Sequence, residues 1–431
     1  MAAMQNKLNK LDIMKGKDAA LRTKLLVVAV LYFAEGVPYG FINTTMTNYL
    51  RKQGMPLEQI GILSLLGFAW SLKLLWAPLV DRFGSRAAWI VPSQIACALG
   101  MIAITWFQVP PAPLGFWILM GLLCLASATQ DIAIDAYTID ILETSELGLA
   151  NGVRNGAYRV ALIAAGGGLI MLSAWMSWSA AFIAVAVIMI ALALTIITFA
   201  IFHQPRPALQ HPNQESLSAR GQIRTAIQGL VRLPHFWAII LFTLFFKFGD
   251  ALMGKTLSAF WVDQGFSQTE IGLISSTLGP VATILGAMIG GWVTSRWGIA
   301  PGLWILGTLQ AVSNLGYWVA AWPGMWRYTT YIASQMESFT GGMGAAAFMA
   351  FLMSLCDKRF SATHYAFFSM LFAFSSAWAG YLGFWGAARW GYAPFFFYTF
   401  LAALPAFALF PWILPLARQF EHGKVMKNEE E

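Results

Sequence analysis

The stretch Phe116–Leu142 reads FWILMGLLCLASATQDIAIDAYTIDIL and combines a long apolar run with three aspartates. The run is long enough to cross a bilayer, which takes roughly 20 residues at about 1.5 Å each. An ionisable group at membrane depth costs about 2.5–3.5 kcal/mol on an insertion scale, and such groups usually face a partner or a cavity. The stretch therefore predicts a transmembrane helix whose polar side, with Asp131 and Asp135, has a function.

The composition of the whole chain supports a membrane protein. Of 431 residues, 58% are hydrophobic and 11% are charged, against about 25% charged in soluble proteins. The net charge of +7 does not indicate nucleic acid, because the basic residues lie in short segments between apolar runs. Neither the three cysteines nor any His/Cys cluster has metal-binding spacing, and no Walker sequence is present. We therefore predict no metal, no cofactor and no ATP-driven step.

Twelve apolar runs are long enough to span a bilayer, so we predict an all-α membrane protein with twelve transmembrane helices. The predicted spans are 25–49, 57–80, 87–109, 114–142, 147–174, 178–202, 235–262, 269–294, 301–322, 328–355, 361–388 and 392–417. Of the 27 Lys and Arg residues, 18 fall on the side of the N-terminus and 4 in the opposite loops. This bias predicts that both termini are cytoplasmic.

The chain is predicted to consist of two related halves. A polar, Pro- and Gln-containing segment, 203–234, is the expected cytoplasmic linker between six-helix bundles at 25–202 and 235–418. The terminal segments 1–24 and 419–431 are expected in the cytoplasm. RKQGMPLEQIGILSLLG, from Arg51, is similar to VDQGFSQTEIGLISSTLG, from Val262. These matching loops indicate an internal repeat.

Parallel six-helix repeats are the design of the major facilitator superfamily. Its loop signature Gly-x-x-x-Asp-Arg-x-Gly resembles Ala77-x-x-x-Asp81-Arg82-x-Gly84 and Gly291-x-x-x-Ser295-Arg296-x-Gly298. The resemblance implies two six-helix halves around a central cavity. It also implies a gating loop with Asp81, Arg82, Gly84 and Arg296. The alternative is a solvated turn whose charges only set the topology.

Ionisable residues recur on helices 1, 4, 7 and 10, which line the cavity in this superfamily. The proton-coupling candidates are Glu35, Asp131, Asp135, Asp250 and Glu337. The substrate-binding candidates are Asn43, Gln130, Arg154, Asn155, Arg159, Lys247, Lys255 and Thr340. A buried carboxylate can carry a proton, and Arg or Lys can hold an anionic substrate. The alternative for each charge is an internal ion pair that stabilises the bundle.

Helical spacing predicts how some of these charges are arranged. Asp131 and Asp135 share one face, whereas Asp140 lies about 180° around the helix from Asp131; pairing with Arg154 or Arg159 is expected for Asp140. Lys247 and Asp250 are at i and i+3, a spacing that allows an ion pair. Lys73 is expected to extend its stem along the helix and place its ammonium group in solvent.

Several blocks of sequence resemble the AmpG-type muropeptide permeases: GFAWSLKLLWAPLVDR, SATQDIAIDAYTIDIL, KFGDAL, SNLGYW and GGMGAAAFMAFLMSLCDKRFSATHYA. The resemblance implies a proton-driven importer of a glycopeptide, anhydro-muropeptide, in the bacterial inner membrane. Our mechanistic hypothesis is alternating access by rocking of the two halves, in which protonation of Asp131 or Asp135 from the outside releases a basic partner and favours substrate binding. No obligate protein partner is expected.

Two other functions stay open at this point. Glu35 and Lys255 add charges where small or hydroxylic residues are expected in the family, so a siderophore or another polar anionic metabolite is an alternative cargo. A membrane-embedded enzyme or a sensor is less favoured. No Ser/His or Cys/His arrangement occurs at helical spacing, and no soluble output domain is evident.

Overall fold

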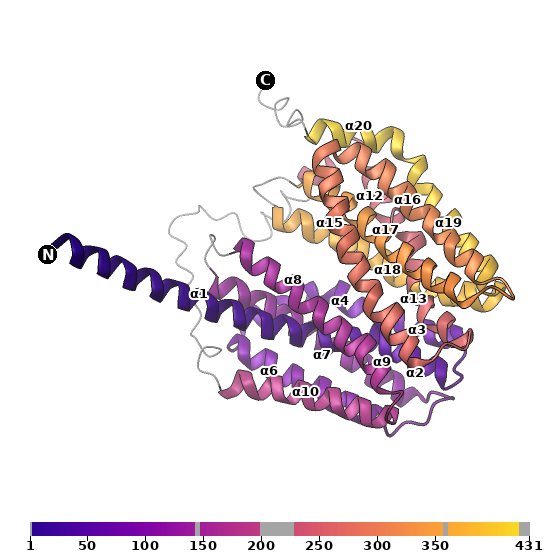
Figure 1. Cartoon of the computed structure of the whole chain (residues 1–431), viewed down its shortest axis with the longest axis horizontal. Helices are drawn as coiled ribbons and strands as arrows, with labels where there is room; N and C mark the ends of the chain where they lie inside the picture. Colours follow the sequence, from indigo (N-terminus) through magenta and orange to yellow (C-terminus); the bar gives the residue numbers. More distant parts are fainter. Residues whose placement is uncertain (1, 143–146, 199–227, 357–360, 422–431) are drawn as a thin grey trace. The chain divides into compact units, whose positions relative to one another are not determined.

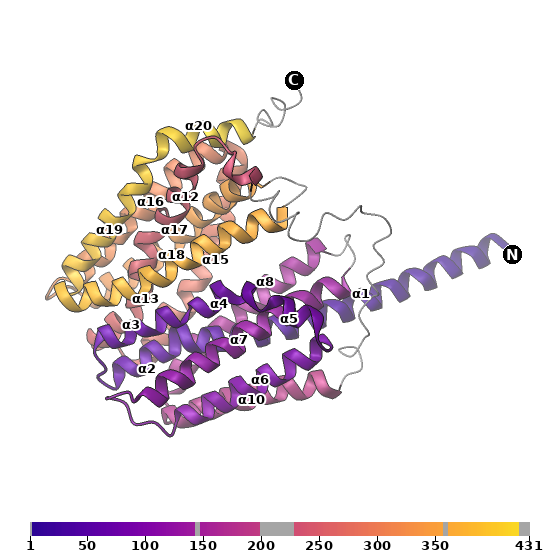
Figure 2. The same cartoon turned by 180° about the vertical axis from the view of Figure 1, so that it is seen from behind.

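The computed structural model of the chain describes residues 2–142, 147–198, 228–356 and 361–421, and all regular structure within these ranges is helical (Figures 1 and 2). The chain divides into two compact units. Unit 1 comprises Met1–Thr45, Leu72–Gln108 and Ala112–Leu209. Unit 2 comprises Met46–Ser71, Val109–Pro111 and Gln210–Glu431. Most of the predicted linker 203–234 and of the tail 419–431 lies outside the described residues.

Unit 1 is a bundle in which α1 packs against α8, and α6 packs against both α7 and α10 (Figures 1 and 2). Its elements are α1 (Ala2–Gly40), η1 (Phe41–Met46, ending in unit 2), η2 (Lys73–Leu75), α5 (Ala77–Arg82), α6 (Arg86–Ile104), α7 (Leu114–Ile141), α8 (Leu147–Ile163), η3 (Ala164–Gly168), α9 (Leu169–Leu172) and α10 (Trp178–Thr198). Its core includes Val28 and Leu31 of α1 and Ile132–Ile134 of α7. The helices that carry the predicted polar face are therefore held by an apolar core beside it.

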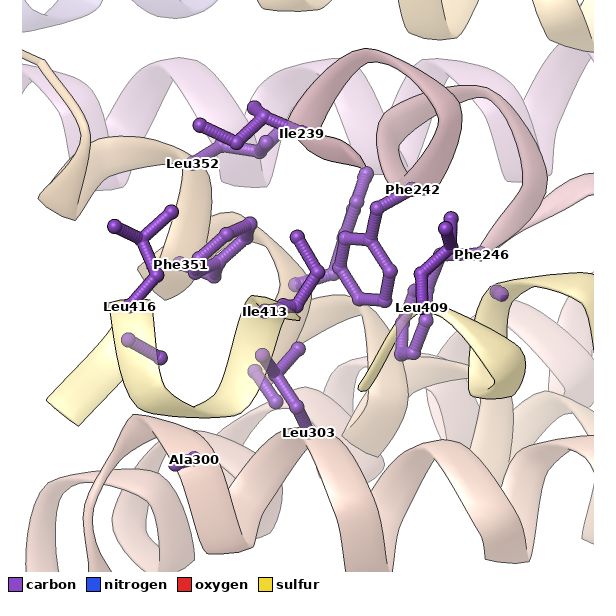
Figure 3. Close-up of a cluster of buried hydrophobic side chains, with 14 of the residues drawn as sticks. Ile239, Phe242, Phe246, Ala300, Leu303, Phe351, Leu352, Leu409, Ile413 and Leu416 are labelled. Carbon is purple, nitrogen blue, oxygen red and sulfur yellow. The ribbon is translucent and has the colours of Figure 1, made fainter. Parts of the chain in front are cut away.

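Unit 2 contains the remaining helices. They are α2 (Thr47–Lys52), α3 (Leu57–Leu66), α4 (Phe68–Leu72, ending in unit 1), α12 (Phe236–Phe245), α13 (Phe248–Asp263), α14 (Gln268–Glu270), η5 (Ile271–Leu278), α15 (Gly279–Trp297), α16 (Ile299–Ala320), α17 (Arg327–Ser354), α18 (Ser361–Trp390), α19 (Tyr392–Ala408) and α20 (Phe410–Glu421). α17 packs against both α15 and α16, and α13 packs against α18 and α19. Figure 3 shows part of its core, where Phe242, Phe246 and Phe351 meet Leu303 and Ile413.

Residues 46–71, which the sequence assigns to the first half, lie in unit 2. α3 packs against α18, and α2 packs against α13. At the end of α2, Arg51 Nε and Nη2 lie 2.6 and 2.7 Å from the Asp263 carboxylate. The Tyr392 hydroxyl donates to the same carboxylate at 2.6 Å. One carboxylate thus ties the ends of α2, α13 and α19 together.

Helical segments occupy all twelve predicted spans, but the span count differs by criterion. Within the described residues, eight helices are long and apolar enough to cross a membrane, or nine if the bent pair α19 and α20 counts as one span. That pair is bent by 57°. The predicted span 235–262 agrees with the candidate span Phe236–Asp263, although the helix is interrupted between α12 and α13. The predicted span 57–80 is divided, because the chain departs from α-helix around Lys73, and the apolar helix there covers Leu57–Leu72.

Three π-helical segments of the described chain, η1, η3 and η5, also lie within predicted spans, and η1 and η3 meet. The Thr45 hydroxyl donates to the carbonyl oxygens of Ala165 and Gly166 at 2.6 and 3.2 Å. Widened π turns disturb the regular hydrogen-bond ladder, and lipid offers no alternative donor. Thr45 therefore satisfies backbone groups at the place where the two irregular segments meet.

Glycine permits the closest helix contacts in both units. In unit 1, a Cβ added at Gly36 would lie 2.7 Å from Ala161 Cβ on α8. In unit 2, a Cβ added at Gly290 of α15 would lie 2.6 Å from the Met343 backbone of α17. Apolar burial gives little preference for helix–helix over helix–lipid contact in a membrane, so close van der Waals packing carries the association.

Gly290 and its neighbour Gly291 provide a matched test of this packing. A Cβ at Gly291 would meet no atom of the described chain within 4 Å. Gly290→Leu should lower the free energy of unfolding by about 1–3 kcal/mol or more through overpacking, whereas Gly291→Leu should be near neutral. Thermal unfolding of both purified variants in detergent checks this, and equal melting temperatures would contradict the proposed contact.

Candidate functional site

Unit 1 contains a cluster of charges around α7, which we name the α7 cluster: Glu35, Lys73, Asp131, Asp135 and Arg154, with Tyr32. Lys73 Nζ lies 3.9 Å from Asp131 Oδ2 and 3.6 Å from Asp135 Oδ2. Arg154 Nη2 lies 3.1 Å from Asp135 Oδ1, and the Tyr32 hydroxyl donates to the same oxygen at 2.7 Å. The predicted shared face of Asp131 and Asp135 is therefore the face on which these partners gather.

Lys73 joins the α7 cluster because its helix is interrupted. α4 ends at Leu72, and a short 3₁₀ segment leads into α5, which has Pro78 in its first turn. Proline has no N–H to donate to the carbonyl four residues earlier, and its ring crowds that carbonyl. The prediction that Lys73 places its ammonium group in solvent was wrong, since the ion pairs with α7 hold it. Pro78 was the sequence signal for the interruption.

Arg154 is held on two sides. Its guanidinium carbon lies 4.5 Å from the centroid of the Tyr32 ring, a cation–π arrangement, while Nη2 pairs with Asp135. Its side chain is still 40% exposed. Asn155 and Arg159, on the same helix, are exposed. Arg154 is thus an oriented cation with room for a further anionic partner.

Glu35 is the carboxylate of the α7 cluster to which the described residues supply no ion pair. Among the described residues no basic nitrogen lies within 4.0 Å of it, and its Oε2 atom has no hydrogen-bond partner. The residue is only 8% exposed. The charges acting on it are those of Asp131, Asp135, Lys73 and Arg154. Tyr32, one helical turn before Glu35, was missed in the sequence, although the i, i+3 spacing placed both on one face.

Unit 2 contains a second set of charges, which we name the α13 cluster: Lys247, Asp250 and Glu337. Lys247 Nζ lies 2.8 Å from Asp250 Oδ2 and donates to the Gly341 carbonyl at 3.1 Å. The pairing predicted from the i, i+3 spacing is confirmed. Like Lys73, Lys247 stands at a helix interruption, between α12 and α13.

Glu337 completes the α13 cluster. A Cβ on Gly341 would lie 3.7 Å from Glu337 Oε1 and 4.0 Å from Asp250 Oδ2, so both carboxylates face this glycine. Ser338 donates to Glu337 Oε2 at 3.3 Å. No basic nitrogen of the described chain lies within 4.0 Å of Glu337. Each cluster therefore combines an ion pair with a neighbouring glutamate that has none.

The other predicted site residues lie elsewhere within the units. The Thr340 hydroxyl donates to Ser313 of α16 at 2.8 Å, and Asn43 donates to the Tyr39 carbonyl at 3.1 Å. Lys255 packs against Gly380 of α18. Gln130 is fully buried, and neither of its amide atoms has a hydrogen-bond partner in the described ranges.

Residues near the predicted gating loops have mostly local contacts. Gly84 has a positive φ of 68°, and the exposed Arg82 and Arg296 lie over the rings of Phe83 and Trp292. The side chain of Asp81 lies outside the described part.

The partner expected for Asp140 was wrong: Arg86 Nε lies 3.0 Å from Asp140 Oδ2. Arg86 opens the next helix beyond the loop, and its guanidinium also donates to the Val80 carbonyl.

A model of the Major Facilitator Superfamily matches residues 27–253, more than half of the chain. The chain belongs to the major facilitator superfamily. It is 30% identical over 411 residues to the anhydromuropeptide permease of Escherichia coli K12, covering 93% of this chain and 81% of the relative. It is 29% identical over 401 residues to putative transporter AmpG 4 of Rickettsia conorii, covering 89% and 94%. Within the superfamily the chain is therefore of the AmpG type.

Solved structures agree with a major facilitator fold. A bacterial homologue of the human lysosomal transporter Spinster, in an inward-facing and unoccupied conformation, gives a TM-score of 0.68 at 14% identity. The likeness covers 94% of this chain and 98% of the other. A peptide transporter POT variant gives 0.69 at 13% identity, covering 91% and 95%. The AmpG-type chain is thus a multi-pass membrane transporter and not an enzyme.

Substitutions in the α7 cluster test whether the charge of Lys73 compensates those of Asp131 and Asp135. Lys73→Met leaves Asp131 and Asp135 with Arg154 alone, and should lower the free energy of unfolding by about 1–3 kcal/mol. This is less than the about 3–5 kcal/mol for a fully buried pair, because the Lys73 side chain is 29% exposed. Adding Asp131→Asn should restore more than half of the loss, as measured by thermal unfolding in detergent.

Lys52→Met, which removes an exposed lysine at the end of α2, is the control and should leave stability unchanged. A double variant no more stable than Lys73→Met would show that Lys73 does not compensate these aspartates.

Proposed function

We propose that this AmpG-type chain imports anhydro-muropeptides across the bacterial inner membrane, driven by protons, through alternating access of its two halves. The observation that carries the proposal is the 30% identity, over 93% of the chain, to a protein named for that cargo. The excess of Lys and Arg in the loops on the N-terminal side supports cytoplasmic termini.

The charges of the α7 cluster suit such a cargo. An anhydro-muropeptide is a sugar joined to a peptide that bears carboxylates. A planar guanidinium binds a carboxylate through two parallel hydrogen bonds, and Arg154 is already oriented by Tyr32 and Asp135. Its 40% exposure leaves donors for a cargo carboxylate. In this proposal the cargo competes with Asp135 for Arg154.

Proton coupling is assigned to Glu35 and Glu337. Asp131, Asp135 and Asp250 each have a cation within 4.0 Å, so their charge is already balanced. A buried ionised carboxylate without a counter-ion is costly, and these two glutamates lack one in the described chain. Each is therefore the member of its cluster that gains most from binding a proton. The first assignment, to Asp131 or Asp135, becomes the alternative.

Uptake in cells tests the cargo. A strain without its own muropeptide permeases, expressing this chain, should accumulate radiolabelled anhydro-muropeptide unmodified and should lose that accumulation when a protonophore is added. A ferric siderophore is the comparison cargo. Siderophore uptake without muropeptide uptake would refute the proposed cargo, and chemical conversion of the muropeptide would refute a carrier.

A comparison of counterflow exchange with gradient-driven uptake tests whether the two glutamates, and not the aspartates, bind the coupled proton. Glu35→Gln and Glu337→Gln keep the shape of the side chain but cannot release a proton. Each should reduce uptake driven by a pH gradient in proteoliposomes at least tenfold while leaving counterflow of labelled for unlabelled muropeptide within about twofold of wild type.

Glu58→Gln, an exposed position on α3, is the matched control and should change neither activity. Gradient-driven uptake that survives in both Glu35→Gln and Glu337→Gln would return the assignment to Asp131 or Asp135.

A further inference from the structure

A row of buried polar side chains in unit 2 lies along α16 and belongs to neither charge cluster. Gln310, Asn314 and Tyr317 lie at i, i+4 and i+7 on one face of α16, and each is at most 3% exposed. Trp261 of α13 is fully buried beside the last of them. We name these four residues the α16 seam.

Five polar atoms in the α16 seam lack a protein partner among the described residues: Gln310 Oε1, Asn314 Oδ1 and Nδ2, the Tyr317 hydroxyl and Trp261 Nε1. Ser334 and the Trp261 indole are the polar neighbours of the Tyr317 hydroxyl, but neither completes a hydrogen bond of acceptable geometry. Nearly all buried polar groups in native proteins are hydrogen-bonded to protein or to ordered water. The unpartnered atoms of Gln310 and Asn314, with the Tyr317 and Trp261 groups beside them, therefore favour small polar guests between α13, α16 and α17.

Neighbouring groups in the same interface are satisfied by protein. Thr340 donates to Ser313 at 2.8 Å, and Ser313 donates to the Gln310 carbonyl at 2.7 Å. The contact between α16 and α17 is therefore well formed next to the unpartnered atoms. A general looseness of packing does not explain them.

The α16 seam runs past Glu337. Gln310 lies against the backbone of α17 at Gly344, where no Cβ would fit, and Tyr317 lies near Ser334. α16 and α17 run antiparallel, so Asn314 falls between these two levels, at the height of Glu337. The charged and titratable groups that face Glu337 are Lys247, Asp250 and Tyr317.

The other end of the α16 seam approaches exposed groups. The Trp261 ring stacks on Tyr331, with centroids 5.8 Å apart, and the Tyr331 hydroxyl donates to Glu270. Glu270 pairs with Arg327, whose side chain is 52% exposed. An exposed ion pair at the start of α17 thus lies one stacked aromatic pair away from the α16 seam.

We propose that the α16 seam holds a file of water molecules along which protons reach Glu337, with Tyr317 and Asn314 as positioning residues. Water suits the seam because it can donate and accept in turn, as the mixed donors and acceptors here require. In the transfer step a hydronium ion in the file gives its proton to a Glu337 carboxylate oxygen, leaving water and a neutral carboxyl group. This inference rests on the proposed proton coupling.

Infrared spectroscopy after a pH jump tests the α16 seam without any cargo. The wild-type protein should show a carboxyl C=O band on acidification that is absent in Glu337→Gln. Asn314→Leu should slow the appearance of this band at least tenfold. Tyr317→Phe keeps the ring packed against Phe260 and Phe396, loses only the hydroxyl, and should slow the band several-fold.

Gln94→Leu is the control, because Gln94 of α6 in unit 1 is equally buried and its amide atoms are also unpartnered in the described chain. It should leave the rate unchanged. Folded Asn314→Leu and Tyr317→Phe proteins that respond as fast as wild type would overturn the proposal. If Asn314→Leu and Tyr317→Phe slow the carboxyl band as expected but the protein takes up no muropeptide, the proposed function is contradicted. The proposal of a water file in the α16 seam would then still hold.

Discussion

A charge inside an apolar helix must be balanced by another group of the protein, and this requirement organises both units. Asp135 alone receives Lys73, Arg154 and the Tyr32 hydroxyl, so one carboxylate ties together side chains from α1, the interrupted second span, α7 and α8. Asp250 holds Lys247 in the same way. Glu35 and Glu337, beside these ion pairs, are the carboxylates to which we assign the proton in the proposed transport.

The backbone adapts to bring these groups together. Gly36 and Gly290 allow helices to approach until main chains touch, which is how helices associate when the solvent is itself apolar. Thr45 satisfies carbonyls at the π-helical segment η3. Close packing and irregular turns therefore occur together, since an irregular turn in a membrane is tolerated where protein groups replace the lost hydrogen bonds.

Local patterns predicted what depends on local geometry. The apolar run before Asp131 predicted α7 almost to its ends, and the spacing of Lys247 and Asp250 predicted their ion pair. The partners of Lys73 and Asp140 were not predictable in the same way, because each lies on a different helix. Lys73 pairs with α7 from the interruption between α4 and α5, and Arg86 reaches Asp140 from the helix after the loop. The transport roles of all these residues stay predictions.

The two lysines at helix interruptions give the charge clusters a particular mechanical property. On a continuous helix the Cα–Cβ direction is fixed by the whole cylinder, so moving a side chain means moving the helix. Lys73 and Lys247 stand where that cylinder is broken, and a few backbone torsions there can turn the side chain. In the proposed transport, we expect each ammonium group to exchange a protein carboxylate for a cargo carboxylate at these breaks. Such an exchange would need only local changes of backbone torsion, and the packed helices on either side could stay in place.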